Sequence, residues 1–547
     1  MSRSACCFAV SLFLAAATSA GEEPSGIQPA TVAGGAYDAA SEAPLAKVRV
    51  TLYQTGRGGQ QRYSSVTDTG GTFRFDQVAP GAYRLSAEKN RYARAAYGEK
   101  RPGSGGAEIV VTAGQRLEGL TVKLTPAAVI LGRVLDEDGE PIPHAQATAM
   151  RYQYTGGEKR LTPVSGGVTT NDLGDYRMFG LAPGRYYLAV SYRGRGGRFL
   201  PLRGPSAVSP DISYPTVFYP GVYEADQAQP LRLAAGEERT GVDFQLAPMR
   251  GVRVRGRVVP SGERLAVSLL PRRGAMVFGS VRSEPADPKT GEFEIAGALP
   301  GSYTLFAVTR GRDQRLFGRL PVEVGGDTVD GLTLSLTPGV SVSGQLRIED
   351  KPAGTRLDAL RVELSPRGSW FGGGAGSVDA EGAFTLDGMA PGTYSIGVNG
   401  LPEGAFLKSA RFGRLDLIGG GLEVSEGGLS DLAVTVSLKG ALLTGVVFDE
   451  DKQPAPGALV TLVPDAARRT RPELFLTATT DQYGRFTISG ISPGEYRALA
   501  FDHVERGAYR DPDFLEPFEG DGEKVKLEEG GQRVVELRLL LAGEDGT

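Results

Sequence analysis

The sequence predicts an all-β protein that is built from five β-sandwich modules in tandem. Glycine makes up 78 of the 547 residues, about 14% against a usual share of about 7%, which indicates many turns. Apolar and polar residues alternate over short stretches, as they do in half-buried strands. An aromatic strand followed by a Pro-Gly turn recurs five times at spacings of 103, 117, 91 and 102 residues. Spacings of this size correspond to one complete domain for each repeat.

The repeated motif joins two strands through a turn. In each copy an aromatic residue stands eight positions before the turn glycine, and a tyrosine follows that glycine by two positions. The copies run from Phe73 to Tyr83, Tyr176 to Tyr186, Phe293 to Tyr303, Phe384 to Tyr394 and Phe486 to Tyr496. Proline at the first central position and glycine at the second predict a type II turn. We expect each tyrosine to be structural, with its ring packed and its hydroxyl bonded to nearby backbone.

A second shared segment opens several copies, and it sets the expected boundaries. A glycine precedes a proline by nine positions in three places: Gly445 and Pro454, Gly132 and Pro141, and Gly35 and Pro44. Each copy ends on a further alternating strand, and the next copy begins within a few residues. The predicted modules 1 to 5 are therefore 21–126, 127–249, 250–338, 339–439 and 440–547. Linkers this short predict little independent tumbling of the modules, in a rod, and they leave open whether the array is a straight rod or bent.

The two segments together resemble carboxypeptidase-regulatory-like domains. Module 5 matches best, with Asp481-Gln482-Tyr483-Gly484-Arg485-Phe486 leading into Pro493-Gly494-Glu495-Tyr496. The resemblance implies transthyretin-like sandwiches of about seven strands, a fold grouped with carbohydrate-binding-like and collagen-adhesin B-type modules. Modules 3 and 4 depart from the pattern, because no clean acidic turn follows Gly256 or Gly344. In this family such domains often accompany a carboxypeptidase catalytic domain or an outer-membrane receptor barrel, and the five modules leave no room for either.

The first 20 residues have the features of a secretory signal peptide. Arg3 gives the positive start, the apolar run from Phe8 to Ala17 is too short to span a bilayer, and Thr18-Ser19-Ala20 offers small residues for cleavage. Both cysteines, Cys6 and Cys7, lie inside this segment, so the mature chain is expected to have no disulfide. The sequence thus predicts an exported protein, periplasmic or extracellular at the cell surface, with no transmembrane segment in the mature chain.

Charge and residue usage argue against several functions. With 60 basic and 64 acidic residues the formal net charge is −4, so nucleic acid is not an expected partner. His144 and His503 fall in different predicted modules, and neither has another histidine at metal-ligand spacing. We therefore expect no catalytic residues, no metal ligands and no cofactor. An enzyme with an unrecognised site is the weakest of three interpretations.

Aromatic residues in loops are the candidate ligand contacts. Trp370 and Phe371 lie in a glycine-rich hairpin loop of module 4. An insertion in module 2 carries four more: Tyr214, Phe218, Tyr219 and Tyr223. Exposed rings stack on sugars or anchor protein partners, and the alternative is that these rings fold back over their own module.

Two functional interpretations follow from these aromatic residues and from the modular organisation. The first is a non-catalytic structural spacer with a binding or adhesion surface outside the cytoplasm, whose partner is carbohydrate or another extracellular or cell-surface protein. The second is a carbohydrate-binding array that uses the loop aromatics.

Overall fold

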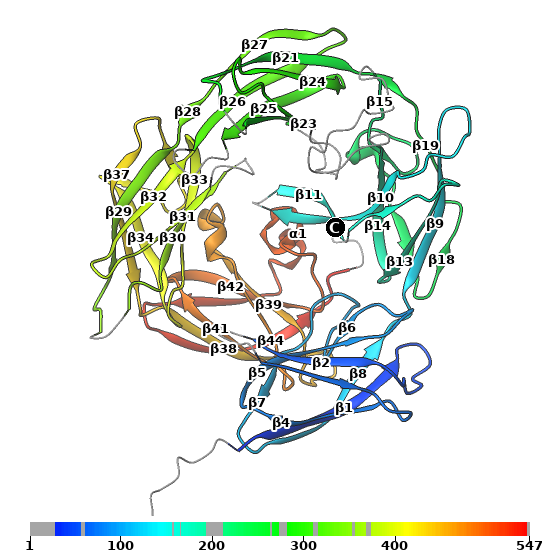
Figure 1. The fold of residues 1–547 in the computed structure, drawn as a ribbon. Coiled ribbons are helices and arrows are strands. Elements are labelled where there is room, and N and C mark those ends of the chain that lie inside the picture. The colour runs from blue at the N-terminus through cyan, green and yellow to red at the C-terminus, as the bar shows by residue number, and fades with distance from the viewer. Residues whose placement is uncertain are drawn as a thin grey trace, which may run out of the picture.

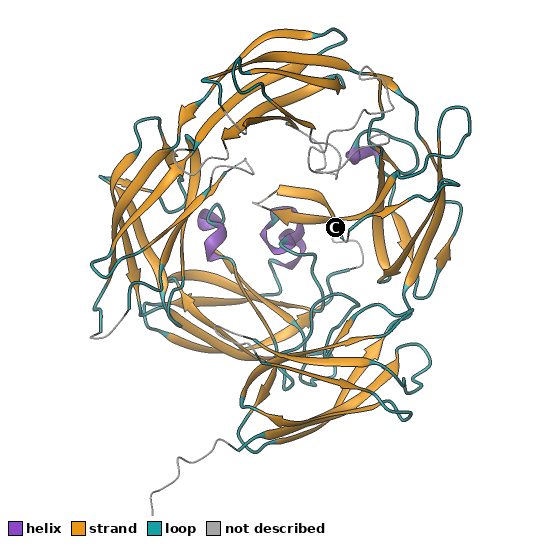
Figure 2. Cartoon of the chain, viewed as in Figure 1, coloured by secondary structure: helices purple, strands orange, loops and turns teal. Residues whose placement is uncertain are grey.

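The computed structural model describes residues 28–55, 61–155, 158–164, 166–192, 212–262, 265–272, 282–309, 315–352, 356–367 and 373–543 (Figure 1). Strands make up most of its regular structure, and the helical segments are single turns (Figure 2). These are η1 (Ala225–Gln227), η2 (Ala466–Arg468), η3 (Pro472–Leu474), η4 (Ala508–Arg510), α1 (Pro512–Leu515) and η5 (Glu516–Phe518). The all-β prediction is confirmed. Within the described ranges, no helix has the length and apolar character needed to cross a bilayer.

Module 1 shows the plan that the other modules repeat. Its strands are β1 (Ala30–Asp38), β2 (Arg49–Gln54), β3 (Arg62–Val66), β4 (Thr72–Val78), β5 (Gly81–Glu88), β6 (Ala95–Ala96), β7 (Ile109–Val111) and β8 (Arg116–Leu124). The opening strand β1 pairs antiparallel with β4 and parallel with the closing strand β8, and we call these three the outer sheet. The inner sheet is centred on β2 and β5, with β3, β6 and β7 beside them.

The remaining strands follow in chain order. Module 2 contains β9 (Ala128–Leu135), β10 (Gln146–Thr155), β11 (Glu158–Pro163), β12 (Val168–Thr169), β13 (Asp175–Leu181), β14 (Gly184–Ser191), β15 (Ile212–Ser213), β16 (Val217–Phe218), β17 (Leu231–Leu233), β18 (Glu238–Arg239), β19 (Phe244–Gln245) and β20 (Met249–Arg250). Module 3 contains β21 (Val252–Val259), β22 (Leu265–Pro271), β23 (Arg282–Pro285), β24 (Glu292–Ala298), β25 (Gly301–Thr309), β26 (Leu316–Val324), β27 (Val329–Ser335) and β28 (Thr337–Pro338).

Module 4 contains β29 (Val340–Ile348), β30 (Arg361–Pro366), β31 (Gly374–Ser377), β32 (Ala383–Met389), β33 (Gly392–Asn399), β34 (Phe406–Phe412), β35 (Leu415–Asp416), β36 (Leu422–Val424) and β37 (Leu429–Ser437). Module 5 contains β38 (Ala441–Phe448), β39 (Leu459–Pro464), β40 (Leu476–Thr479), β41 (Arg485–Ile491), β42 (Gly494–Phe501), β43 (Glu523–Leu527) and β44 (Gln532–Leu540).

The outer sheet recurs with the same strand order along the chain. Its later versions are β13-β9-β18, β24-β21-β27, β32-β29-β37 and β41-β38-β44, and the closing strand is always parallel to the opening one. The inner sheets are centred on the pairs β10 and β14, β22 and β25, β30 and β33, and β39 and β42. In module 5 the two sheets join, because β42 and β44 pair at their ends.

Each stretch of this pattern encloses its own hydrophobic core. Five clusters of buried residues extend from Ala30 to Leu124, Ala128 to Leu246, Val252 to Leu336, Val340 to Val436 and Ala441 to Leu537. The strand alternation explains this arrangement, since every second residue of an outer or inner strand points into the space between the sheets. The cores give each module the buried apolar area that a sandwich needs.

The repeated tyrosines are structural, as the motif predicts. Tyr83, Tyr186, Tyr394 and Tyr496 are each at most 4% exposed. Their hydroxyls donate hydrogen bonds of 2.6–2.7 Å to the carbonyl oxygen four residues upstream, which caps the turn. Tyr303 departs from the pattern, since it is half-buried and lacks this bond among the described residues.

The predicted type II turn is wrong. The turn glycines have φ between 138° and 158°, whereas the second central residue of a type II turn has φ near +80°. Each glycine starts the following strand in an extended conformation of positive φ, which a side chain would strongly disfavour.

One sequence alignment in module 1 also needs correction. The glycine that lies opposite the motif aromatic is Gly34, paired with Phe73, and not Gly35. Module 1 has one additional residue in its first turn, because its bridge joins Tyr37 to Pro44, while the corresponding bridge in module 2 joins Leu135 to Pro141.

The modules do not form a rod. Modules 2 to 5 curve around a common centre, and module 1 lies outside this arrangement and touches module 5 (Figure 1). The inner sheets of modules 2, 3, 4 and 5 face this centre, whereas their outer sheets form the periphery (Figure 1). The prediction of a rod failed because linker length limits independent tumbling without fixing the direction in which successive modules turn.

Candidate functional site: the contacts that close the chain

Module 5 closes the chain by docking a turn on the edge of the inner sheet of module 1. The side-chain oxygen of Gln482 accepts a hydrogen bond from the backbone N–H of Val110, at 3.1 Å. The side-chain nitrogen of Gln482 donates to the carbonyl oxygen of the same residue, at 3.0 Å. Next to it, Asp481 forms a parallel β-bridge with Glu108. The Gln482 carboxamide thus pairs with β7 as a peptide group of a neighbouring strand would.

A partly buried ion pair forms a second contact between modules 1 and 5. Arg101 of module 1 lies 3.1 Å from the carboxylate of Asp502, whose side chain is 9% exposed. The second oxygen of Asp502 accepts the backbone N–H of Ala542, at 3.0 Å. The backbones also meet closely, because a Cβ on Gly457 would lie 1.8 Å from the carbonyl oxygen of Gly98. Removing Arg101 would leave the buried Asp502 carboxylate without its cation, so this contact is specific.

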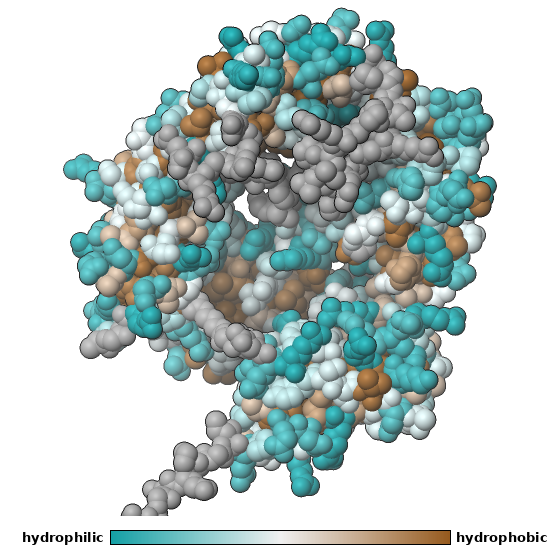
Figure 3. Space-filling view, in the orientation of Figure 1, coloured by the Kyte–Doolittle hydropathy of each residue, from teal (hydrophilic) through white to brown (hydrophobic). Residues whose placement is uncertain are grey.

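Module 2 contacts module 5 across the centre. Tyr154, near the end of β10, is 8% exposed and packs with buried residues of module 5, among them Phe501 and Phe514. Its backbone N–H donates to the carbonyl oxygen of Arg506, at 3.1 Å. Burial, together with the Asp511 carboxylate that its hydroxyl faces, raises the pKa of Tyr154. Hydrophobic side chains are visible in the hollow at the middle of the molecule (Figure 3).

Titratable groups with shifted pKa values lie in the segments of modules 1 and 5 that make these contacts. Burial raises the pKa of the Glu99 carboxyl to about 7, although it accepts a backbone N–H from Gly103. Burial also lowers the pKa of His503, and Arg101 acts in the same direction. Burial raises the pKa of Glu505, opposed by basic side chains of module 2. Protonation of these groups is therefore coupled to the contacts that bury them.

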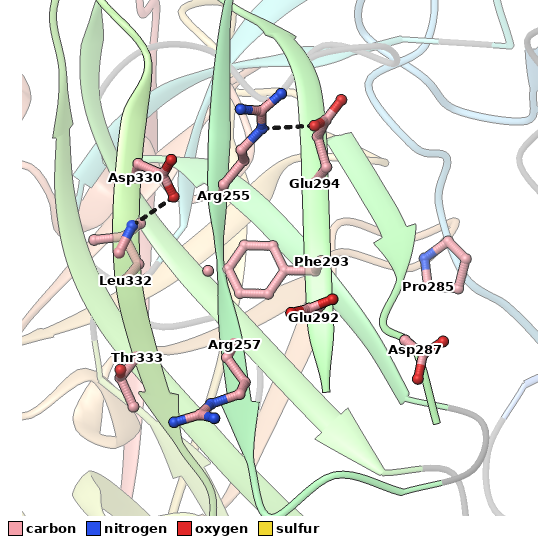
Figure 4. Close-up of a pocket in the computed structure, with 12 residues that line it drawn as sticks. Arg255, Arg257, Pro285, Asp287, Glu292, Phe293, Glu294, Asp330, Leu332 and Thr333 are labelled. Atoms are coloured by element: carbon pink, nitrogen blue, oxygen red, sulfur yellow. Dashed lines mark hydrogen bonds and ion pairs between the residues drawn. The ribbon is translucent and has the colours of Figure 1, made fainter. Parts of the chain in front are cut away.

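A second candidate is a hollow of about 710 Å³ on the outer sheet of module 3 (Figure 4). Its walls carry charges from neighbouring strands, and Glu294 holds both Arg255, at 2.6 Å, and Arg253, at 2.8 Å. Gly256 lines the hollow. A Cβ at this position would come within 2.4 Å of the carbonyl oxygen of Leu332, so the close approach of β21 and β27 requires glycine here. Every module has a glycine at this place, so the shape follows from the common plan and does not by itself indicate a ligand.

The four aromatic residues of module 2 that were predicted as ligand contacts differ in how exposed their rings are. Phe218, on β16, is 4% exposed and packs with Met150 and Tyr187 on the inner sheet. Tyr214 and Tyr219 are half-buried against the core of their own module. These three rings fold back over module 2, which is the alternative that the sequence left open.

Tyr223 remains accessible, with 48% of its surface exposed. Trp370 and Phe371 lie outside the described residues. Tyr223 is thus the accessible candidate on the described part of the insertion.

The two histidines lie in different modules. His144 is exposed in a turn, with φ of 62°, where module 5 has Gly457. His503 lies at the junction of modules 1, 2 and 5. Within the described ranges, no three histidine, cysteine or acidic side chains are grouped as metal ligands. Sequence reasoning missed the closing contacts, since Gln482 and Arg101 lie in loops without periodic signal.

The geometry defines a multi-module β-sandwich protein whose modules are fixed to one another by loop and hairpin contacts. Residues 31–125, 129–201 and 443–539 match the family model of the carboxypeptidase regulatory-like domain. These three regions are carboxypeptidase regulatory-like domains, and the resemblance seen in the sequence is confirmed. They fall in modules 1, 2 and 5, whereas the motifs of modules 3 and 4 depart from the family pattern.

Similar solved structures include two bacterial pilins and a collagen binding protein. The minor pilin GBS52 of Streptococcus agalactiae is 13% identical, with 40% of this chain and 96% of the pilin covered and a TM-score of 0.22. The shaft pilin SpaA of Lactobacillus rhamnosus GG is 11% identical, with 41% of this chain and 98% of the pilin covered and a TM-score of 0.19. Two B repeat units of the collagen binding protein of Staphylococcus aureus are 13% identical, with 75% of this chain and 100% of the repeat units covered and a TM-score of 0.13. The comparison with curated proteins finds no match.

Proposed function

We propose that the protein is a non-catalytic, exported scaffold that acts as a structural spacer and contact surface outside the cytoplasm. The observation that carries the proposal is the reciprocal pair of hydrogen bonds between Gln482 and Val110. Together with the Arg101–Asp502 ion pair, it fixes two modules that are far apart in sequence. Specific contacts that fix the relative placement of the modules give the protein a surface of defined shape, which suits a scaffold.

The proposal includes export from the cytoplasm, which can be tested directly. The apolar run and small residues before Gly21 support removal of a signal peptide and a periplasmic or cell-surface location. N-terminal sequencing of the protein recovered from fractionated cells should begin at Gly21, in the periplasmic or surface fraction. An intact Met1 in the cytoplasmic fraction would contradict it.

The modules are proposed to be five separate folding units. Their proposed boundaries lie near residues 126, 249, 338 and 439, between successive hydrophobic clusters. Limited proteolysis followed by mass spectrometry should release fragments that end near these positions. Cleavage that starts within the clusters would contradict this division.

A carbohydrate-binding array is a second candidate function, supported by the exposed ring of Tyr223. Trp370 and Phe371 are proposed as further contacts on the sequence argument alone. A flat ring that is accessible from one side stacks on a sugar face. A glycan array probed with the mature protein should give a signal that Tyr223→Ala or Trp370→Ala weakens. A signal that neither variant changes would exclude these contacts, and an empty array would favour a protein partner.

A further inference from the structure

The inner sheets differ in what covers the face that is turned away from their own core. In modules 2 and 5 an insertion after the second central strand packs apolar side chains on this face, such as Phe218 beside Ala189 and Phe514 beside Leu499. In module 4 the segment after β33 pairs with the outer sheet instead, as β34. The corresponding face of β30 and β33 therefore lacks an insertion of this kind among the described residues, and it is turned toward the centre of the molecule (Figure 1).

This face of module 4 is hydrophilic and is built on small residues. Its side chains along the two central strands are exposed or half-buried, and they belong to Arg361, Glu363 and Ser365 on β30 and to Ser395, Gly397 and Asn399 on β33. Glu363 lies opposite Gly397 on one side and opposite Ala375 of β31 on the other. A carboxylate thus stands at the middle of the face, between the two smallest residue types.

Neither the backbone nor the available space requires glycine at position 397. The φ of Gly397 lies outside the left-handed region, and a Cβ there has no atom within 4 Å. Gly344 on β29 is different, since a Cβ there would lie 2.0 Å from the carbonyl oxygen of Leu432. The residues that correspond to Gly397 in modules 1, 2, 3 and 5 are Ser86, Ala189, Phe306 and Leu499. Glycine weakens a strand and often marks a place where a ligand approaches the backbone closely, so the space over Gly397 is a candidate binding position.

Hydrogen bonds hold the polar side chains around this space. Glu363 accepts from the Ser365 hydroxyl, at 3.1 Å, and from the side-chain nitrogen of Asn399. Arg367 donates to the Ser395 hydroxyl, at 3.1 Å, and to the backbone of the loop before β36. A carboxylate accepts about four hydrogen bonds, and a carboxamide both donates and accepts. Glu363 and Asn399 therefore have donors and acceptors left for a ligand.

We propose that this face binds a neutral sugar residue of a carbohydrate, with the sugar ring over Gly397. The proposal rests on carbohydrate binding, the second proposed function, and gives that function a site. Sugar hydroxyls donate to carboxylates and accept from carboxamides and guanidinium groups, and this face presents all three. A charged ligand fits less well, because Glu363 would repel an anion, whereas Arg361 and Arg367 on either side of it would repel a cation.

The test uses the labelled mature protein on an array that carries neutral oligosaccharides and glycans ending in uronic or sialic acid. Neutral oligosaccharides should bind, and titration calorimetry with the strongest of them measures the affinity. Gly397→Leu introduces the residue type that module 5 has at position 499, and it should abolish detectable binding because it fills the space over the sheet. Glu363→Ala removes the central acceptor and should weaken binding by about tenfold or more.

Thr385→Leu is the matched control, because it adds the same side chain at an exposed position of β32, on the outer sheet of module 4. It should change the affinity by less than about twofold. Circular dichroism shows whether each variant folds. Gly397→Leu should fold, since a side chain there has open space, and Glu363→Ala decides the matter if it does not.

Binding of acidic glycans alone, or binding of neutral oligosaccharides that Gly397→Leu and Glu363→Ala leave unchanged, would overturn the proposal. If Tyr223→Ala weakens that unchanged binding, carbohydrate binding stands and only this site is wrong. An array without any signal would overturn both carbohydrate binding and this site. It would leave the scaffold function and closure of the chain untouched.

Discussion

Gly445 and Phe486 lie opposite each other on β38 and β41, and the Phe486 ring fills the space that a side chain at 445 would need. A Cβ on Gly445 would lie 2.8 Å from that ring and 2.1 Å from the carbonyl oxygen of Val535 on the closing strand. The same pairing of glycine and aromatic recurs as Gly34 with Phe73, Gly132 with Tyr176, and Gly256 with Phe293. The glycine of the first motif segment and the aromatic of the second therefore form one packing unit.

Gly445→Ala should destabilise module 5 by about 3 kcal/mol or more, because the methyl group meets a backbone oxygen that cannot rotate away. Gly520→Ala is the matched control in the same module, since a Cβ there has no atom within 4 Å. Urea unfolding followed by circular dichroism measures both. Equal midpoints for the two variants would show that β38 can move away from β44 at little cost.

Tyr496→Ala should cost about 3–5 kcal/mol in the isolated module of residues 440–547, as large-to-small aromatic changes in a core do. Tyr496→Phe removes the hydrogen bond that the hydroxyl donates to the carbonyl oxygen of Ser492 and the one that it accepts from Arg468, and should cost about 1–2 kcal/mol. The isolated module should give a folded β spectrum and melt cooperatively. A random-coil spectrum would refute its independence, and a loss below about 1 kcal/mol for Tyr496→Ala would place the ring outside the core.

The local features of the fold were predictable from sequence, because their causes are local. Alternation and the fixed distance between the motif aromatic and Tyr496 are determined by the pleat of a strand and the length of one turn. The type II assignment failed because a Pro-Gly pair is compatible with more than one positive φ at the glycine. Phe218 could not be placed, since burial in an insertion depends on where that insertion folds back.

The closing contacts were beyond sequence reasoning for a different reason. Gln482 and Arg101 are polar residues in loops, and such residues are ordinarily solvated. Their partners lie 372 and 401 positions away along the chain. Only the directions in which four successive modules turn bring these residues together, and no periodicity records those directions.

Stability should depend on pH through Glu99. Its pKa is about 7 in the folded chain against an ordinary value of 4.5, so between these values the folded state holds a proton that the unfolded state has released. The contribution of Glu99 to the free energy of unfolding therefore falls as the pH rises from about 4.5 to about 7, and it remains lower above pH 7. Glu99→Gln removes the effect. It should match the wild type at pH 4 and exceed it at pH 8, by at most about 3 kcal/mol.

Melting curves of the two proteins from pH 4 to pH 8 decide this point. His503 and Glu505 titrate in both proteins, so the difference between the curves isolates Glu99. A difference that is constant with pH would show that the Glu99 carboxyl is not buried in the folded chain.

Tyr154→Ala should separate module 2 from module 5 without unfolding either. Loss of the ring exposes the apolar surface around Phe514, and amide exchange of residues 503–515 should accelerate by about tenfold or more. Tyr152→Ala is the matched control, because that ring contacts Tyr187 within module 2. Equal effects of both variants on residues 503–515 would mean that the contact across the centre contributes nothing specific.

Small-angle scattering of the mature protein tests the central claim, closure of the chain, most directly. Five modules of about 30 Å each, arranged end to end, would give a maximum dimension of about 150 Å or more and a radius of gyration above about 40 Å. A fully compact chain of this length has a radius of gyration of about 24 Å, and an arrangement around an open centre is somewhat larger. The closed structure predicts a value below about 35 Å, and a value above about 40 Å with a rod-like distance distribution would contradict it.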